Sequence, residues 1–308
     1  MTYFCGWDGG GTATKICLVN ERGEITAQGA SGPLNLNGAP AEAVEETVKN
    51  GVAFLAAQPG GLAACRGLVI GFAGASNPAA AQVIERAMRA CGYTGGLRLT
   101  GDCDIALAGA VTGPGAVLIA GTGSVCYGKD AAGRPLRTGG FGWLFDDAGS
   151  GYAIGKDILS AAARFYDGCG PATALADLLQ RKTGIENLRD LTAWTYAPET
   201  GKAQIAALAP LLLEALEQND AAALAIERKA ARDLADLAIA AWKKAGLTAG
   251  ELALTGGVLT HFEGIRQQVT EKLQTALPQA AVTAPRHSAA FGAAALAKEA
   301  FGFTENTP

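Results

Sequence analysis

The stretch Trp7-Asp8-Gly9-Gly10-Gly11-Thr12 lies between two segments that have the pattern of buried strands. The apolar residues 3–7 precede it, and a β-rich run over residues 15–20 follows it. A turn at residues 21–24 and a third run from Ile25 come next. The glycines are therefore expected in the tight turn of a β-hairpin.

The residue types in this turn point to a phosphate. Glycines leave backbone N–H groups bare, so the oxygens of an anion can approach closely, and Thr12 adds a hydroxyl. Asp8 places a carboxylate beside that anion, which makes sense if a cation such as Mg²⁺ lies between them. A plain hairpin is the alternative, but three glycines flanked by Asp and Thr exceed what a turn requires.

Composition bounds the class of protein. The chain has 308 residues, 49% hydrophobic and 18% charged, enough for two domains. A net charge of −4 without a basic run argues against nucleic acid or an anionic membrane as partner. The N-terminus has no signal-peptide pattern, and the seven cysteines are scattered without a C-x-x-C pair. We expect a soluble cytoplasmic protein with reduced thiols.

The opening pattern restarts after Gly113-Pro114-Gly115. A buried strand over 116–120 leads to the turn Gly121-Thr122-Gly123-Ser124, a strand over 125–129 and a second turn at 131–134. The order of elements repeats that of the N-terminus, which indicates an internal duplication with a boundary near residue 112. Two phosphate-binding hairpins are therefore expected.

Between and after these hairpins, strands alternate with helices, as in an α/β fold with a mixed sheet. A strand over 67–72 ends in a loop that contains Ser76, and a strand over 97–100 runs into Gly101-Asp102-Cys103-Asp104. Helix-forming sequence extends from Tyr152 to about residue 245, and a strand over 251–255 ends at Gly256-Gly257.

With Asp8–Thr12, the Asp102 loop, Gly121–Ser124, Asp147-Ala-Gly-Ser-Gly151 and Thr255-Gly-Gly257 in this order, the chain resembles the BadF/BadG/BcrA/BcrD-type ATPases. That family belongs to the actin, Hsp70 and sugar-kinase superfamily, and the chain is most similar to its N-acetylglucosamine and bacterial glucosamine kinases. The resemblance covers essentially the whole chain. It implies two duplicated ribonuclease H-like domains with an interdomain nucleotide cleft. These are residues 1–112 with a C-terminal helix at about 288–301, and residues 113–287 with a helical insertion.

The resemblance also implies an activity and a set of site residues. The protein is expected to use ATP and Mg²⁺ to transfer the γ-phosphate to a hydroxyl of an amino sugar, either N-acetylglucosamine or glucosamine. Asp102 matches the general base, and Asp8 matches the position that holds the metal. The nucleotide-binding positions are Gly9, Gly10, Gly11, Thr12, Gly121, Thr122, Gly123, Ser124, Gly256 and Gly257. The sugar-binding positions are Asn35, Ser76, Asp102 and Asp147.

Several of these residues have structural alternatives. Asp102 could simply cap the helix that follows it, and Asp104 could be that cap or the base. Asp147 could be the N-cap of the helix near Ser150, with Asp146 in its sugar role. Asn35 could be a turn residue, with Asn37 as its competitor.

The family segment usually reads Gly-Trp-Gly-aromatic before Gly-Asp-Glu-Gly-Ser. In this chain Phe141 replaces the Trp, Asp146 replaces a Gly and Ala148 replaces the Glu, which helps to hold the sugar in some relatives. The extra carboxylate at Asp146 leads to the hypothesis that unacetylated glucosamine is the substrate. Phe141 and Trp143 are expected in the core rather than as a sugar platform.

Two other functions compete with the kinase. One is an ATPase that activates a radical dehydratase, but the scattered cysteines offer no convincing pair for a bridging iron–sulfur cluster. The other is a non-enzymatic sensor of ATP or sugar. The sequence leaves the oligomeric state open, with a homodimer as one option.

Overall fold

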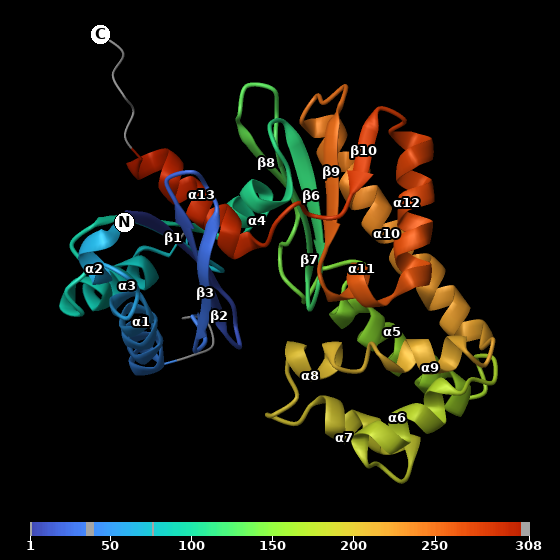
Figure 1. The fold of residues 1–308 in the computed structure, drawn as a ribbon. Coiled ribbons are helices and arrows are strands. Elements are labelled where there is room, and N and C mark those ends of the chain that lie inside the picture. Colours follow the sequence, from blue (N-terminus) through green and yellow to red (C-terminus); the bar gives the residue numbers. More distant parts are fainter. Residues whose placement is uncertain (1, 35–39, 76, 303–308) are drawn as a thin grey trace. The chain divides into compact units, whose positions relative to one another are not determined.

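Figure 1 shows the computed structural model, which describes residues 2–34, 40–75 and 77–302. The chain divides into two compact units. Unit 1 comprises the chain up to Thr112 and again from Pro285, and unit 2 is Gly113–Ala284. Each unit is built on its own five-stranded mixed sheet, which confirms the α/β class.

Unit 1 contains β1 (Tyr3–Gly9), β2 (Thr14–Asn20), β3 (Ile25–Ser31), α1 (Ala41–Ala56), α2 (Gly61–Ala64), β4 (Cys65–Phe72), α3 (Pro78–Ala90), β5 (Gly96–Gly101), α4 (Asp102–Ala110) and α13 (Ala289–Phe301). Unit 2 contains β6 (Gly115–Ala120), β7 (Ser124–Lys129), β8 (Pro135–Gly139), α5 (Gly151–Tyr166), α6 (Leu175–Thr183), η1 (Leu188–Asp190), α7 (Leu191–Thr195), α8 (Lys202–Ala206), α9 (Leu211–Leu216), α10 (Ala221–Lys244), β9 (Gly250–Thr255), α11 (Gly257–His261), α12 (Glu263–Ala276) and β10 (Ala280–Thr283).

The two sheets have the same topology. Unit 1 has the strand order β3-β2-β1-β4-β5, and unit 2 has the strand order β8-β7-β6-β9-β10. In both sheets the first strand of the unit is central, with the second and third strands on one side of it and the fourth and fifth on the other. In each sheet the first three strands form antiparallel hairpins, and the last two run parallel to the first strand. Both glycine-rich stretches therefore occupy the turn between the first and second strands, as the sequence predicted.

The β1 strand separates two cores in unit 1 by simple alternation. Cys5 and Trp7 face the core beneath α1 and α3, whereas Phe4 faces the core that α13 covers. Figure 1 shows α13, the red helix, lying against the blue strand β1. Gly6 makes this contact so close that a Cβ there would lie 2.1 Å from the Ala294 nitrogen.

The chain returns to unit 1 before α13 begins. The backbone N–H groups of Arg286 and His287 donate to the carbonyl oxygens of Ala110 and Gly109, at 3.2 and 2.8 Å. Ser288 then caps α13 through its hydroxyl, which accepts from the Phe291 N–H. The end of α4 is thereby joined to the start of α13.

In unit 2 the long helix α10 packs on β6, β7 and β8, and α12 packs on α10 and β10. The α5–α9 segment, predicted as a helical insertion, adds a buried leucine-rich core that merges with that of the sheet. Asp220 joins the two parts, because its carboxylate caps α10 and also accepts from the Thr173 hydroxyl and the Ala174 N–H. Among the described residues, none of the helices is long and apolar enough to cross a bilayer.

Candidate functional site

The first glycine turn joins β1 to β2 and carries exposed backbone N–H groups. The Gly10 N–H donates to Ala13 O at 3.1 Å, and Gly10 O accepts from the Leu34 N–H at 3.0 Å. Gly11 and Thr12 are exposed, and within the described ranges neither of their N–H groups donates a hydrogen bond. Bare N–H groups in a tight turn are available to bind an anion.

Two carboxylates lie at the end of the same sheet. Gly9, Phe72 and Gly101 are neighbours across β1, β4 and β5, so Asp8 precedes this row by one residue and Asp102 follows it by one. Because these three strands are parallel, their carboxyl ends meet at one edge, where open α/β sheets bind ligands. The fold thus brings together the predicted metal residue and the predicted base.

Electrostatics supports the proximity of these two groups. Burial raises the pKa of Asp8 above its usual value, the positive charge of Lys15 opposite it on β2 lowers it, and the negative charge of Asp102 raises it again. A half-buried carboxylate next to a second one favours a bound cation, because a cation offsets both the burial and the repulsion.

Asp102 and Asp104 have different roles at the start of α4. Asp104 accepts from the Thr100 hydroxyl at 2.6 Å and from the Gly101 N–H at 3.3 Å, so it is the capping residue. Asp102 is exposed, and its Oδ1 accepts from the Cys103 N–H at 2.9 Å. Of the two alternatives, Asp104 is therefore the cap, and Asp102 faces solvent at the sheet edge.

The donor set at this edge fits Mg²⁺ held together with a substrate phosphate. Within the described ranges, no group of three or more His, Cys, Asp and Glu side chains could hold a metal by itself. Mg²⁺ in phosphoryl-transfer sites is bound through one or two carboxylates, with phosphate oxygens and water completing its shell. Asp8 provides one such carboxylate.

The second glycine turn joins β6 to β7 and is attached to the start of α5. Gly121 O and Thr122 O accept from the N–H groups of Gly151 and Tyr152 at 2.8 and 3.3 Å. The Ser124 hydroxyl donates to Ala148 O at 2.7 Å. Among the described residues, the N–H groups of Thr122 and Gly123 have no acceptor. The turn is thus joined to the start of α5 and still has free donors that an anion could use.

Asp147 is buried directly beside this turn. Its Oδ1 accepts from the Ser124 N–H at 3.1 Å, and its Oδ2 accepts from the Lys202 ammonium at 2.7 Å. The Asp147 backbone has φ of +62°, an uncommon conformation for a residue other than glycine. The helix near Ser150 is capped by Ser150 itself, which accepts from the Ala153 N–H, so the alternative of Asp147 as cap is wrong.

Sequence reasoning missed Lys202. It is the first residue of α8, in the helical part of unit 2, and 55 positions separate it from its partner. The one local signal was a lysine at the start of a helix, where the dipole disfavours a positive charge. That signal is weak, because α8 is only one turn long.

The aromatic segment before Asp147 is largely exposed. Phe141 is 75% exposed and Trp143 is 38% exposed, so the expectation that these two residues lie in the core is wrong. Trp143 packs edge-on against Tyr152 of α5, with ring centroids 5.3 Å apart. Asp146 closes the segment, because its Oδ2 accepts from the Phe141 N–H at 2.8 Å. Its carboxylate therefore has a local structural role.

The remaining predicted residues fall at one strand end or outside the described chain. Gly256 follows β9 with φ of +97°, and a Cβ there would lie 2.3 Å from Ala120 O, so it abuts the residue before the second turn. Gly257 begins α11, where a Cβ would have space. Asn35 and Ser76 lie outside the described residues.

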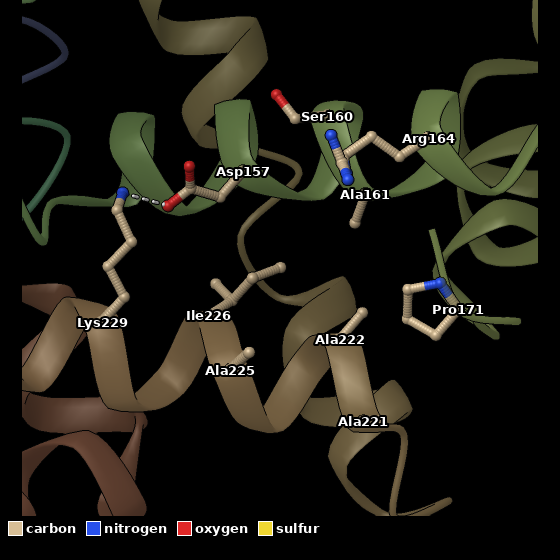
Figure 2. Close-up of a pocket in the computed structure, with 10 residues that line it drawn as sticks. All are labelled: Asp157, Ser160, Ala161, Arg164, Pro171, Ala221, Ala222, Ala225, Ile226 and Lys229. Atoms are coloured by element: carbon tan, nitrogen blue, oxygen red, sulfur yellow. Dashed lines mark hydrogen bonds and ion pairs between the residues drawn. The ribbon is translucent and has the colours of Figure 1, made fainter. Parts of the chain in front are cut away.

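A separate cavity lies between α5 and α10. Figure 2 shows it lined by alanines and Ile226, with Arg164 and the Lys229–Asp157 ion pair at its edges. Its volume is about 320 Å³. None of the predicted site residues lines it.

Two mixed sheets with glycine turns at matching places define the actin-like ATPase and sugar-kinase fold. The fold is shared with a hexokinase of the ROK group from Thermus thermophilus, with a TM-score of 0.59 at 15% identity. Residues 5–297 match the model of the BadF/BadG/BcrA/BcrD ATPase family, and the chain belongs to this family.

Proteins similar to this chain in sequence are named as amino-sugar kinases. An N-acetylmuramic acid/N-acetylglucosamine kinase from Clostridium acetobutylicum is 30% identical over 97% of this chain and 99% of its own. A glucosamine kinase from Vibrio cholerae is 29% identical over 63% and 66% of the two chains. A crystal structure from Chromobacterium violaceum, whose protein has a provisional N-acetylglucosamine kinase name, is 27% identical with a TM-score of 0.75 and covers 96% and 99% of the two chains.

Proposed function

We propose that this protein is an ATP-dependent amino-sugar kinase that transfers the γ-phosphate of ATP to a sugar hydroxyl. The observation that carries the proposal is that each unit has a glycine turn with bare N–H groups, and that unit 1 also has an exposed carboxylate at its sheet edge. Phosphoryl transfer requires positioning, neutralisation of charge and a base, and these parts supply each of them.

Asp102 is the proposed general base. It is exposed at the carboxyl end of β5, and the hydrogen bond from the Cys103 N–H orients its carboxylate. The remaining oxygen can accept the proton of the attacking hydroxyl as the new bond forms. Asp104 is the weaker candidate, because it is less exposed than Asp102 and its Oδ2 accepts from both the Thr100 hydroxyl and the Gly101 N–H.

Asp8 is the proposed metal residue, and the two glycine turns are the proposed phosphate sites. Bound Mg²⁺ would neutralise the charge on the transferred phosphoryl group. The chain contributes the bare N–H groups of Gly11 and Thr12 in unit 1 and of Thr122 and Gly123 in unit 2. Gly256 and Gly257 are proposed to lie against the adenosine, where a side chain would interfere.

The amino sugar is proposed to bind Asn35, Ser76, Asp102 and Asp147. Asp147 can serve a sugar hydroxyl while it holds its present partners, because a carboxylate has about four acceptor positions. The role of Asp146 in closing the 141–146 segment weakens the case for it as an amine ligand. The names of the relatives include both acetylated and free amino sugars, so the preference between them is a quantity to measure.

The test is a panel of sugars with the purified full-length protein and Mg·ATP. N-acetylglucosamine, glucosamine, N-acetylmuramic acid and glucose are each assayed by ADP release, and phosphorylated product is verified by mass spectrometry. We expect at least one amino sugar to exceed glucose by about tenfold or more in kcat/KM, because hydrogen-bonding sites reject analogues that lack the group. If no amino sugar raises ADP release above the sugar-free rate, the proposal is overturned.

A further inference from the structure

Lys202 is held at the second glycine turn by contacts that the glycine motif itself does not contain. Its ammonium is 2.7 Å from Asp147 Oδ2, and a Cβ added to Gly123 would lie 2.8 Å from Lys202 Nζ. Its side chain is 32% exposed, whereas that of Asp147 is 5% exposed. The lysine therefore reaches the turn and keeps access to whatever binds there.

The packing of α8 on α5 fixes this position. Gly155 of α5 lies so close to α8 that a Cβ there would be 2.0 Å from Ile205 O. At Gly151, one turn earlier, an added Cβ would lie 3.2 Å from Gly121 O and 3.7 Å from Ala206. The start of α5 therefore contacts both the glycine turn and the helix that carries Lys202.

The charges at this turn require a cation if an anion is to bind. Asp147 is buried with its Oδ1 on the Ser124 N–H, so its negative charge lies at the turn whose free N–H groups would receive a phosphate. A carboxylate and a phosphate bound at the same turn would repel each other strongly, because the buried carboxylate is poorly screened by water. The Lys202 ammonium offsets the carboxylate, and of its three N–H donors the bond to Asp147 requires one.

We propose that Lys202 is a nucleotide-binding residue, whose ammonium is positioned by Asp147 to contact a phosphate oxygen of ATP at the Gly121–Ser124 turn. The inference rests on the proposed function for the transfer of phosphate from ATP to an amino sugar. The binding of the nucleotide itself can be measured without that reaction. It makes Asp147 a positioning residue for the phosphate turn, in addition to its proposed contact with the sugar.

The first experiment measures the affinity for Mg·ADP and Mg·ATP by calorimetry for the wild type, Lys202→Met and Lys202→Arg. We expect Lys202→Met to weaken nucleotide binding by about 10- to 100-fold, the range for a lost hydrogen bond between charged groups. Lys202→Arg restores most of the affinity, because a guanidinium also donates to carboxylate and phosphate. Lys229→Met is the matched control, since it removes a lysine from the ion pair with Asp157, 2.6 Å long, in the same unit.

A double variant distinguishes a contact with phosphate from a purely structural role. Lys202→Met alone leaves the buried Asp147 charge uncompensated, whereas Asp147→Asn with Lys202→Met leaves no charge. The double variant should therefore recover its melting temperature without nucleotide, yet remain weaker than wild type for Mg·ADP. Its nucleotide affinity should also depend less on salt concentration than that of the wild type.

Steady-state kinetics completes the test. We expect Lys202→Met to raise the KM for ATP and to change the KM for the sugar by less than about twofold. The inference is overturned if Lys202→Met binds Mg·ADP as tightly as the wild type. It is also overturned if the substitution raises the KM for the sugar and leaves the KM for ATP unchanged. A wild type that binds Mg·ADP but phosphorylates no amino sugar would overturn the proposed function and leave this inference to the binding data.

Discussion

Each unit begins with three antiparallel strands joined by two turns, β1–β3 in unit 1 and β6–β8 in unit 2. The two units are alike at the second of these turns and differ at the first, the glycine turn. At the far turn, Asn20 Oδ1 accepts from the N–H groups of Arg22 and Glu24, and Asp130 Oδ1 accepts from those of Ala132 and Arg134. The backbone hydrogen bonds of the two turns also correspond pair by pair. At the glycine turn the similarity ends.

The glycine turn of unit 1 has the Asp8 and Asp102 carboxylates near it, whereas that of unit 2 is held by the Asp147–Lys202 ion pair. The far turns of the two units are held in the same way, whereas different charged groups lie near the two glycine turns. Under the proposed function, unit 1 would provide the metal residue and the base, and unit 2 would provide a neutralised anion site. Four predictions test this division.

The largest effect is expected at Asp102. Asp102→Asn should lower kcat by about 10²–10⁴-fold, the usual contribution of a general base, and should leave Mg·ATP binding nearly unchanged. Steady-state kinetics and calorimetry measure the two quantities. Asp104→Asn is the control, because it weakens the cap on α4 and should lower the melting temperature while most activity remains. Equal losses of kcat in both variants would contradict the assignment of the base.

Asp8→Asn should produce opposite effects on activity and stability. The activity should fall and require more Mg²⁺, because a metal ligand is lost. The raised pKa of Asp8 means that the folded protein holds this proton more tightly than the unfolded chain. The ionised carboxylate therefore costs stability as pH rises through and above its usual value of 3.8.

In metal-free buffer, Asp8→Asn should therefore have a higher melting temperature than the wild type at pH 7. The difference should shrink as pH falls toward 4, where the wild-type carboxyl regains its proton. Melting curves over this pH range, with EDTA present, provide the measurement. A constant difference at all pH values would show that burial of the charge is not its cause.

Substitutions at two glycines of the second turn distinguish an effect on ligand binding from an effect on packing. Gly121→Ala should leave the melting temperature unchanged, because a Cβ there meets nothing within 4 Å, and should raise the KM for ATP by hindering the phosphate. Gly123→Ala places its Cβ 2.8 Å from Asp147 Oδ1, so it should cost about 1–3 kcal/mol of stability. Thermal melts and ATP titrations of both variants test this contrast, and a Gly121→Ala variant with normal ATP kinetics would remove the turn from the phosphate site.

The smallest effect is expected at Asp130. The backbone N–H of Arg134 and then its side chain hold the pKa of Asp130 below its usual value. The resulting stability is present above the usual pKa of an aspartate and is lost as pH falls through the lowered value. Asp130→Asn copies the Asn20 turn of unit 1, so it should melt only slightly below the wild type at pH 7, where the contribution of the Asp130 carboxylate is present, and should be less sensitive to acid. A large loss at pH 7 would show that the two turns are not equivalent.

Much of the fold was predictable because its signals are local. The two glycine turns, the strands beside them and the Asp102 loop each follow from a few consecutive residues, and their repeated order indicated the duplication. Asp102 could be separated from Asp104 only by the structure, since both are suitable caps in sequence. The sequence singled out Asp147 as a candidate, but the residue's positive φ and its two hydrogen-bond partners could not be predicted, because those partners lie 23 and 55 positions away in the chain.

Lys202 shows why the rest was not predictable. Its proposed role depends on the close packing of α8 on α5 at Gly155. No periodicity in the sequence indicates which lysine this packing places beside the second glycine turn. The exposure of Phe141 had a similar origin, because aromatic residues are usually buried and the loop closed by Asp146 keeps this one outside. Non-local packing determined both outcomes.

The position of α13 has a consequence for the order in which the protein forms on the ribosome. Unit 2 is continuous in the chain, whereas one face of the first sheet is covered by α13, a helix that is synthesised after all of unit 2. Until then, Phe4, Val19 and Val69 lack the alanine-rich surface they pack on. Unit 1 therefore completes its core only after unit 2 has been synthesised, which reverses the usual N-terminal-first order of cotranslational folding.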